Sequence, residues 1–250
     1  MKKLLLLLLC VPLIGFGQVY IPDTNFKAYL VGEPLINTNG DSEIQQSEAT
    51  AFNGTISCYY MNISDLTGIE NFTALTTLFC YENQLTSLDV SQNTALTTLF
   101  CDFNQLTSLD VSGATDLYFL QCQSNQLTSL DVSQNTALQY LYCYSNQLTS
   151  LDVRNGNNVN FAYFNATVNP NLSCISVDDS SWSTANWTNI DPQHYFSNNC
   201  SGTTDIKEHP KNKSLLKITD LLGREVNEKQ NTLLFYIYND GTVEKKIIIE

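Results

Sequence analysis

Residues 73–93 read TALTTLFCYENQLTSLDVSQN, and the chain then repeats this phrase three times with few changes. The three further copies occupy residues 94–114, 115–135 and 136–156. A cysteine recurs through the copies at a spacing of 21 residues, preceded by one at a spacing of 22: Cys58, Cys80, Cys101, Cys122 and Cys143. A repeat of this length predicts a solenoid, because each copy forms one rung that buries its apolar face only against its neighbours.

Within one rung, Leu78 and Cys80 are two residues apart, so on a strand both side chains point to the same, inward face. Asn83 then has to turn the chain. Its carboxamide can bond both the backbone that the turn leaves free and the backbone of the next rung. We expect parallel strands on the concave side of each coil, and extended or turn-like backbone opposite, where the apolar residues of the return path are Leu85, Leu88 and Val90.

The pattern L-x-x-L-x-C-x-x-N-x-L, from Leu75 to Leu85, resembles the leucine-rich repeat. The short repeat and its LTSLDVS segment are similar to the internalin-like repeats of bacterial surface proteins. The resemblance covers residues 58–178 and implies a β-rich solenoid, a right-handed coil with caps. The first rung departs by one residue, at Asn62. We interpret 159–168 as the last rung, with Phe164 in the cysteine position and Thr167 in the asparagine position.

The two ends of the chain resemble targeting segments. Residues 1–17 have two lysines, an apolar run and small residues at the end, which predicts a signal peptide. No other apolar run is long enough to span a bilayer. Residues 201–212 are expected to form a polar linker.

Residues 213–250 alternate apolar and polar residues between turn signals, which predicts a small β-sandwich. The segments LLKITDLLGREV, YIYNDG and KKIII resemble the C-terminal sorting domain of the type IX secretion system. That resemblance implies recognition by the type IX secretion machinery, and a secreted or outer-membrane cell-surface location in a Gram-negative bacterium. The alternative is an ordinary additional β domain.

Between Gln18 and Cys200 the only basic residues are Lys27 and Arg154, against seventeen acidic ones. Such an acidic body should repel phosphate, so nucleic acids and anionic membrane surfaces are excluded as partners. The solenoid leaves no length for a catalytic domain. The two histidines, His194 and His209, have no nucleophile partner that the repeat identifies, so we do not expect an enzyme.

Residues 18–57 are expected to form a small helical N-terminal cap, with Asp23 at the start of its first helix. The segment NTNGDSEIQQSE then resembles an EF-hand or dockerin-like loop, although Ser42 replaces the turn glycine and the first ligand is not aspartate. The resemblance implies a weak structural Ca²⁺ site, with a Kd of roughly 10⁻⁴ to 10⁻³ M. The alternative is a solvated turn that caps the next helix. The implied ligands are Asn37, Asn39, Asp41, Glu43 through its carbonyl, and Glu48.

Seven cysteines remain after residue 17, and an oxidising compartment is expected. We predict a disulfide between Cys174 and Cys200 that closes the C-terminal cap, residues 179–200, over Trp182 and Trp187. For the ladder thiols three interpretations stay open. They are apolar filler in a narrow core, disulfides between adjacent rungs, or a metal site; parallel side-chain vectors disfavour the second, and a linear arrangement disfavours the third.

The outward positions of the concave strands are rich in Phe and Tyr, although the core is already built from Leu and Cys. Exposed aromatic rings with a polar surround indicate a binding surface. The rings could instead only stack along the ladder and stabilise strand pairing. The ligand we expect is a protein, with a carbohydrate as the alternative. The candidate ligand-binding residues are Phe79, Tyr81, Phe100, Phe119, Tyr140, Tyr142, Tyr144, Phe161 and Tyr163.

A second row repeats identically on the opposite side of the coil: Asp89, Asp110, Asp131 and Asp152. Because stacked carboxylates repel one another, identity across rungs indicates a structural role. We expect each to accept backbone hydrogen bonds in its turn.

Overall fold

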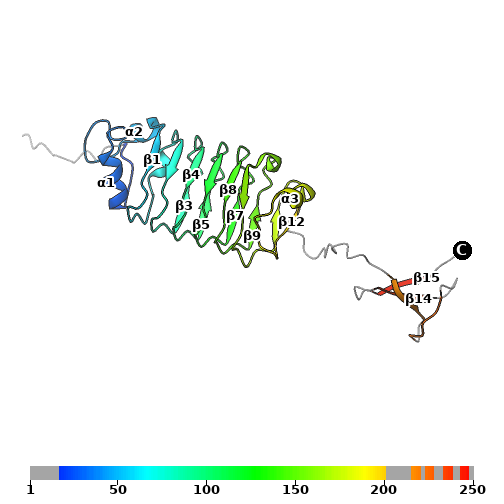
Figure 1. The fold of residues 1–250 in the computed structure, drawn as a ribbon. Coiled ribbons are helices and arrows are strands. Elements are labelled where there is room, and N and C mark those ends of the chain that lie inside the picture. The colour runs from blue at the N-terminus through cyan, green and yellow to red at the C-terminus, as the bar shows by residue number, and fades with distance from the viewer. Residues whose placement is uncertain (1–16, 201–214, 221–222, 228–232, 239–242, 248–250) are drawn as a thin grey trace, which may run out of the picture. The chain divides into compact units, whose positions relative to one another are not determined.

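The computed structural model describes residues 17–200, 215–220, 223–227, 233–238 and 243–247 (Figure 1). The chain divides into two compact units between Cys200 and Ser201. The predicted signal peptide, apart from Gly17, and the predicted linker 201–212 lie outside the described residues. Within the described part of the chain, every helix is too short to cross a bilayer.

The first unit begins with a cap of two short helices, α1 (Thr24–Gly32) and α2 (Gln46–Ala51). Asp23 caps α1 as predicted, since its carboxylate accepts hydrogen bonds from the backbone of Asn25 and Phe26. The other oxygen of Asp23 accepts from the backbone and hydroxyl of Ser64 at 2.8 and 3.0 Å. The same carboxylate therefore starts the helix and fixes it to the first rung.

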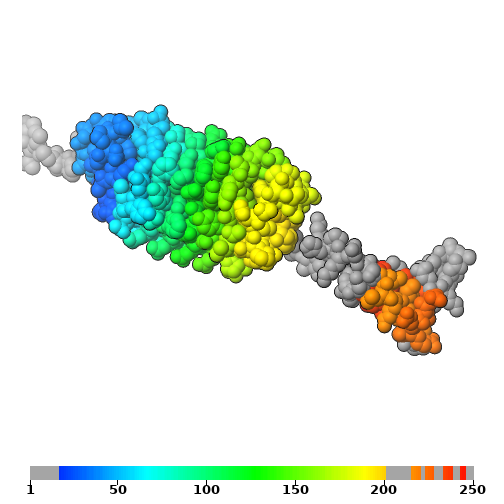
Figure 2. Space-filling view, viewed as in Figure 1, coloured from blue at the N-terminus to red at the C-terminus, as the bar shows by residue number. Residues whose placement is uncertain are grey.

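One side of the solenoid is a six-stranded parallel sheet, which we call the long sheet (Figure 1). Its pairing is in register from rung to rung, so Leu78 lies beside Leu99 and Leu99 beside Leu120. Stacked rungs run as successive bands from cap to cap in Figure 2. In spatial order the strands are β1 (Thr55–Ser57), β2 (Thr77–Phe79), β4 (Thr98–Phe100), β6 (Phe119–Gln121), β8 (Tyr140–Tyr142) and β10 (Tyr163–Asn165).

The opposite side also forms parallel strands, where the sequence predicted only extended or turn-like backbone. Two sheets run along it, one of two strands and one of four. The two-stranded sheet comprises β3 (Ser87–Asp89) and β5 (Ser108–Asp110). The four-stranded sheet comprises β7 (Ser129–Asp131), β9 (Ser150–Asp152), β11 (Cys174–Ser176) and β12 (Tyr195–Ser197). The 3₁₀ turn η1 (Ile69–Asn71) lies between β1 and β2 along the chain, and η2 (Asn158–Asn160) lies between β9 and β10.

The predicted asparagine ladder fills the turn after each inward cysteine. The amide of Asn104 donates to the carbonyls of Cys80 and Cys101 at 3.0 and 3.1 Å, and its oxygen accepts the N–H of Leu85 at 3.0 Å. Asn125 and Asn146 repeat these contacts one rung later each. Each asparagine thus bonds its own turn and the preceding rung, whereas the sequence predicted the next rung.

The last rung is shifted by two residues from the predicted alignment. Phe164 pairs with Leu141 and not with Cys143. Asn169 takes the ladder position predicted for Thr167, because its amide donates to the carbonyls of Cys143 and Ala166. The turn η2 lengthens this rung, so Ala166 and not Phe164 stands in the cysteine position.

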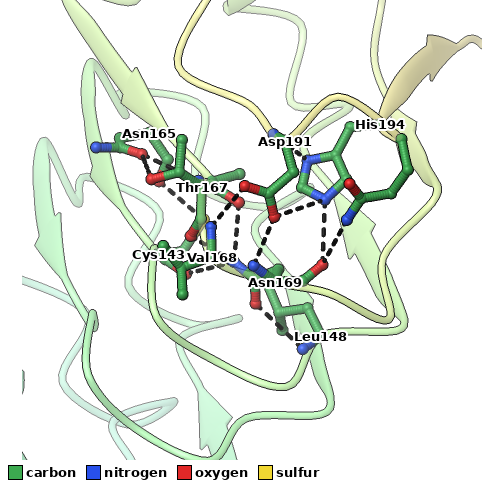
Figure 3. A network of polar contacts seen from close by, with 10 residues as sticks. Cys143, Leu148, Asn165, Thr167, Val168, Asn169, Asp191 and His194 are labelled. Carbon is green, nitrogen blue, oxygen red and sulfur yellow. Dashed lines mark hydrogen bonds and ion pairs between the residues drawn. The ribbon is translucent and has the colours of Figure 1, made fainter.

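The C-terminal cap consists of α3 (Ser180–Asn186), β12 and the turn between them. The Asp191 carboxylate accepts the N–H groups of Val168 and Asn169, both at 2.8 Å, where no further rung follows (Figure 3). Buried His194 bridges the Asn169 carbonyl and the Asp191 N–H through its two ring nitrogens. The Asp191–His194 pair therefore closes the backbone of the last rung.

The predicted disulfide between Cys174 and Cys200 is present and ties the end of the cap to β11. Trp187 is buried in the cap and stacks on Phe164 at 4.2 Å, and half-buried Trp182 packs on Trp187 edge to face at 5.9 Å. The cap thus covers the last rung with aromatic side chains.

The described residues of the second unit form one antiparallel sheet of β13 (Leu215–Thr219), β14 (Leu233–Tyr238) and β15 (Val243–Ile247). This differs from the predicted sandwich, because three strands supply one sheet and no second layer within the described residues. Leu234 and Tyr236 are its buried apolar side chains.

Candidate ligand-binding face

The outward side chains of the long sheet form a surface that we call the aromatic face. Burial alternates along each strand, so that Leu78 is buried while Thr77 and Phe79 on either side are half-buried. The same alternation recurs in β4, β6 and β8. That this side of the solenoid is concave stays a prediction. All nine residues predicted to bind a ligand are half-buried: Phe79, Tyr81, Phe100, Phe119, Tyr140, Tyr142, Tyr144, Phe161 and Tyr163.

Rings of the aromatic face form a column that crosses five rungs. Ring centroids lie 4.9 Å apart for Phe79 and Phe100, and 5.1 Å apart for Phe100 and Phe119. Tyr142 stacks on Phe119 at 5.6 Å and on Tyr163 at 4.5 Å. Each such pair stabilises the sheet by about 0.5–1.5 kcal/mol. The stacking that the sequence offered as an alternative is therefore present, and each of these rings stays partly exposed.

Two of the predicted positions lie elsewhere than expected. Tyr163 pairs with Tyr140, not with Tyr142, as the two-residue shift of the last rung requires. Phe161 precedes β10 and packs on Trp187 of the cap at 5.2 Å. A pocket lined by Phe161, Tyr163 and Trp182, among others, lies where the aromatic face meets the cap.

Four aromatic residues beside the predicted set are more exposed than its members. Tyr59 stacks on Tyr81 at 4.7 Å, and Tyr118 lies 5.3 Å from Tyr140. The sequence reasoning missed them because it considered only three positions of each rung. In the sequence these residues could have been found in the irregular first rung and at single departures from the repeat. The four are Tyr59, Tyr60, Phe103 and Tyr118.

The column of rings is bordered by a polar pair in the row that follows the cysteines. Asp102 and Gln123 occupy equivalent positions in adjacent rungs, and their exposed fractions are 7% and 5%. Among the described residues, Oδ1 of Asp102 and Oε1 of Gln123 have no hydrogen-bond partner. Burial, with the nearby charge of Glu82, raises the pKa of Asp102 to about 6, although its own backbone N–H lowers it.

The five ladder cysteines are buried free thiols, as the filler interpretation predicts. Burial raises the pKa of Cys58 and Cys143 to about 12 and that of the other three well above the usual range. Cys101 donates a weak hydrogen bond to the Gln121 carbonyl at 3.4 Å. No cluster of three potential metal-ligating side chains of His, Cys, Asp or Glu occurs among the described residues.

The aspartate row on the opposite side has the structural role predicted for it. Asp89, Asp110 and Asp131 are exposed, and each accepts the N–H of the residue two positions later at 2.8–2.9 Å. Asp152 does the same for Arg154 and also pairs with its guanidinium. These carboxylates complete turns.

The predicted calcium loop is held by its own hydrogen bonds. The carboxylate of Glu48 accepts from the backbone of Thr38, Asn39 and Gln45 at 2.8–3.0 Å, and also from the Thr38 hydroxyl. Glu48 also completes a capping box at the start of α2. Both of its oxygens are thus engaged, which does not fit the bidentate ligand expected at the last position of an EF-hand loop.

The other implied ligands are also engaged within the cap. Asn37 donates to the carbonyls of Val31 and Asp41 at 3.0 and 2.8 Å. Asn39 accepts the N–H of Asp41 at 2.8 Å, and the Asp41 carboxylate accepts the N–H of Glu43 at 2.7 Å. These contacts are those of a helix-capping turn in which Asn37 and Glu48 are buried. Calcium binding at Asn37, Asn39, Asp41, Glu43 and Glu48 stays a prediction.

Comparisons with known proteins agree with the repeat architecture. No family model matches the chain. Over 75 residues, 30% of this chain, the sequence is 40% identical to internalin J of Listeria monocytogenes serotype 4b (strain F2365). That match spans 8% of internalin J, so the chain covers a small part of its relative.

Among solved structures, the functional domain of InlJ from Listeria monocytogenes, which includes a cysteine ladder, is similar with a TM-score of 0.52. The identity is 37%, over 62% of this chain and 36% of that one. Internalin C2 from strain 4b F2365 of the same species is 19% identical, with a TM-score of 0.40, over 73% of this chain and 98% of that one. The chain therefore has an internalin-like leucine-rich-repeat solenoid fold.

Proposed function

We propose that this chain is a secreted or cell-surface binding protein without catalysis that docks a protein ligand on the aromatic face. The observation that carries the proposal is the row of half-buried rings on the outward side of the long sheet. The interior is already filled by Leu and Cys, so the fold does not need these rings to cover its core. Rigid rings offer a large contact area at a low entropic cost.

The chemistry of the ligand follows from charge. Residues 18–200 carry seventeen acidic and two basic side chains, so a basic protein surface complements them. The similarity to the functional domain of InlJ, which includes a cysteine ladder, supports this proposal. Export by the signal segment and the type IX tail belongs to the same proposal, on sequence resemblance alone.

A selection of displayed random peptides and a glycan array, both probed with the whole protein, test this function. We expect peptide ligands whose affinity falls at least tenfold in Tyr142→Ala and Tyr144→Ala. Ser150→Ala, on the opposite side of the same coil, is the matched control and should leave affinity unchanged. Binding to glycans alone, or peptide binding that none of these substitutions changes, would overturn the proposal.

A further inference from the structure

Two buried oxygen acceptors on the aromatic face have no donor. Oδ1 of Asp102 and Oε1 of Gln123 are both without a hydrogen-bond partner among the described residues. A buried polar atom left unpaired costs folding free energy, and buried carboxylates are normally paired. After the other three ladder cysteines this row holds Tyr59, Tyr81 and Tyr144. An unpaired acid in this row is therefore a departure that the fold does not need.

The two acceptors are placed to share one donor group. Their strands are in register, since Phe100 pairs with Gln121 and the N–H of Phe103 donates to the carbonyl of Gln123. In-register parallel strands set equivalent side chains about 4.8 Å apart. A single ammonium group that donates two hydrogen bonds of about 2.8 Å spans that separation.

The groups around Asp102 supply no positive charge. Those that influence or feel its charge are an acid, two phenols and three buried thiols. The basic side chains of residues 18–200 are already engaged, Lys27 with Glu43 and Arg154 with Asp152. The neighbours of Asp102 are Glu82, Tyr60, Tyr81, Cys80, Cys101 and Cys122.

We infer that Asp102 and Gln123 form a site for a ligand's lysine side chain, with its ammonium group between the two acceptors and its alkyl stem on the neighbouring rings. This inference deepens the proposed function by naming the group of the protein ligand that the aromatic face recognises. Tyr81 lies close enough to Asp102 to feel its charge, and an aromatic ring attracts a cation through its face. Because Asp102 is only 7% exposed and its Oδ1 is buried, the carboxylate has to turn toward the ligand, and a small end group needs less movement than a whole sugar ring.

Fluorescence anisotropy with labelled pentalysine and with its fully acetylated form tests the site, using the whole protein at low ionic strength. At pH 7.5 we expect pentalysine to bind and the acetylated peptide not to bind. Asp102→Asn should weaken binding at least tenfold. Asp110→Asn removes one carboxylate from the opposite side and is the matched control for general charge, so it should change affinity less than twofold.

The pH profile gives a second readout. Affinity of the wild-type protein should fall as the pH drops through about 6, where Asp102 gains its proton. The affinity of Asp102→Asn should show no such step. Asp102→Asn also removes a buried unpaired charge, so it should melt at a higher temperature than wild type at pH 7.5, and lost binding cannot be ascribed to unfolding.

Equal weakening by Asp102→Asn and Asp110→Asn would overturn the site, because it would show attraction to net charge alone. Binding of the acetylated peptide as tight as that of pentalysine would also overturn it. So would competition by neutral oligosaccharides, which would assign the acceptors to hydroxyl groups. If Tyr142→Ala abolishes binding of selected peptides while Asp102→Asn has no effect, the result supports the proposed function and contradicts the lysine site.

Discussion

The interior of the solenoid and the aromatic face are built on the same strands but follow different rules. Inward positions repeat almost without change, and the ladder asparagines are bonded through both amide atoms, as Asn125 is to two carbonyls and to the N–H of Leu106, although Oδ1 of the inward Asn93 and Asn135 has no partner among the described residues. Outward positions change from rung to rung, from Tyr81 to Asp102 to Gln123, and two of their buried oxygens are unpaired. This difference indicates that positions identical between rungs hold the stack together, while positions that vary are free to bind a ligand.

The largest effect should come from breaking the interior ladder. Asn125→Ala leaves the N–H of Leu106 and the carbonyls of Cys101 and Cys122 without their side-chain partner. We expect a loss of about 3 kcal/mol or more in the free energy of unfolding, measured by urea denaturation. Gln126→Ala, the exposed next residue, is the control and should change it by less than about 0.5 kcal/mol. Equal losses would mean that the ladder is not what holds the rungs.

The ladder thiols should be unreactive in the folded protein. Burial keeps their pKa near 12 or above, so almost no thiolate exists at pH 8 and the sulfur atoms are out of reach. Iodoacetamide followed by mass spectrometry should find no alkylated cysteine under native conditions and five after unfolding in guanidinium. Rapid native alkylation would contradict the inward placement, and fewer than five labels after unfolding would revive disulfides between rungs.

Asp102→Asn, which should weaken ligand binding, should also stabilise the fold. The pKa of Asp102 is raised above its unfolded value, so the folded state binds the extra proton between about pH 4 and 6. Its unpaired charge therefore destabilises the fold above pH 6, and this cost fades as the pH falls. Asp102→Asn should raise the melting temperature at pH 7.5 by a few degrees, which corresponds to a gain of about 1 kcal/mol in the free energy of unfolding.

That gain should shrink toward zero as the pH approaches 4, which calorimetry at a series of pH values measures. A variant that melts lower than wild type at pH 7.5 would show that the carboxylate has a stabilising partner. Asp110→Asn is the control variant here too, since Asp110 is exposed and accepts one N–H in its turn.

The smallest effect concerns the N-terminal cap. If the loop binds calcium with a Kd of about 10⁻³ M, then about 2 mM calcium should stabilise the protein by about 0.6 kcal/mol over a chelator. Calorimetric melting with calcium, magnesium and EDTA measures this, and no difference among the three would remove the site. Glu48→Gln should abolish any calcium effect. It should also destabilise the cap without calcium, because Glu48 accepts four hydrogen bonds.

The sequence predicted the fold wherever one rung copies the next. It placed Leu78, Cys80 and Asn83 correctly, because a period of 21 residues fixes the register once strands alternate. It failed at the last rung, where η2 adds two residues in a stretch with no repeat to align. Counting 21 residues from Cys143 led to Phe164, while the hydrogen bonds place Ala166 and Asn169 in the equivalent positions.

The candidate site was predicted in part for a similar reason. Alternation identified the outward rings, including Phe100 and Tyr142. It could not show that Asp102 is buried, because burial of an outward side chain depends on the size of its neighbours and not on the period. The role of Glu48 was likewise ambiguous from the sequence, since a carboxylate at that position can either bind a cation or cap a helix.

The most direct test is the free energy of unfolding along one rung, with residues 140–146 replaced by alanine one at a time. We expect losses of about 2–5 kcal/mol at Leu141 and Asn146, and smaller losses of about 1–2 kcal/mol at Tyr140 and Tyr142, each of which contacts two other rings. Outward tyrosines that cost as much as Leu141 would contradict this expectation. The rings would then belong to the fold itself and would not be free for a ligand.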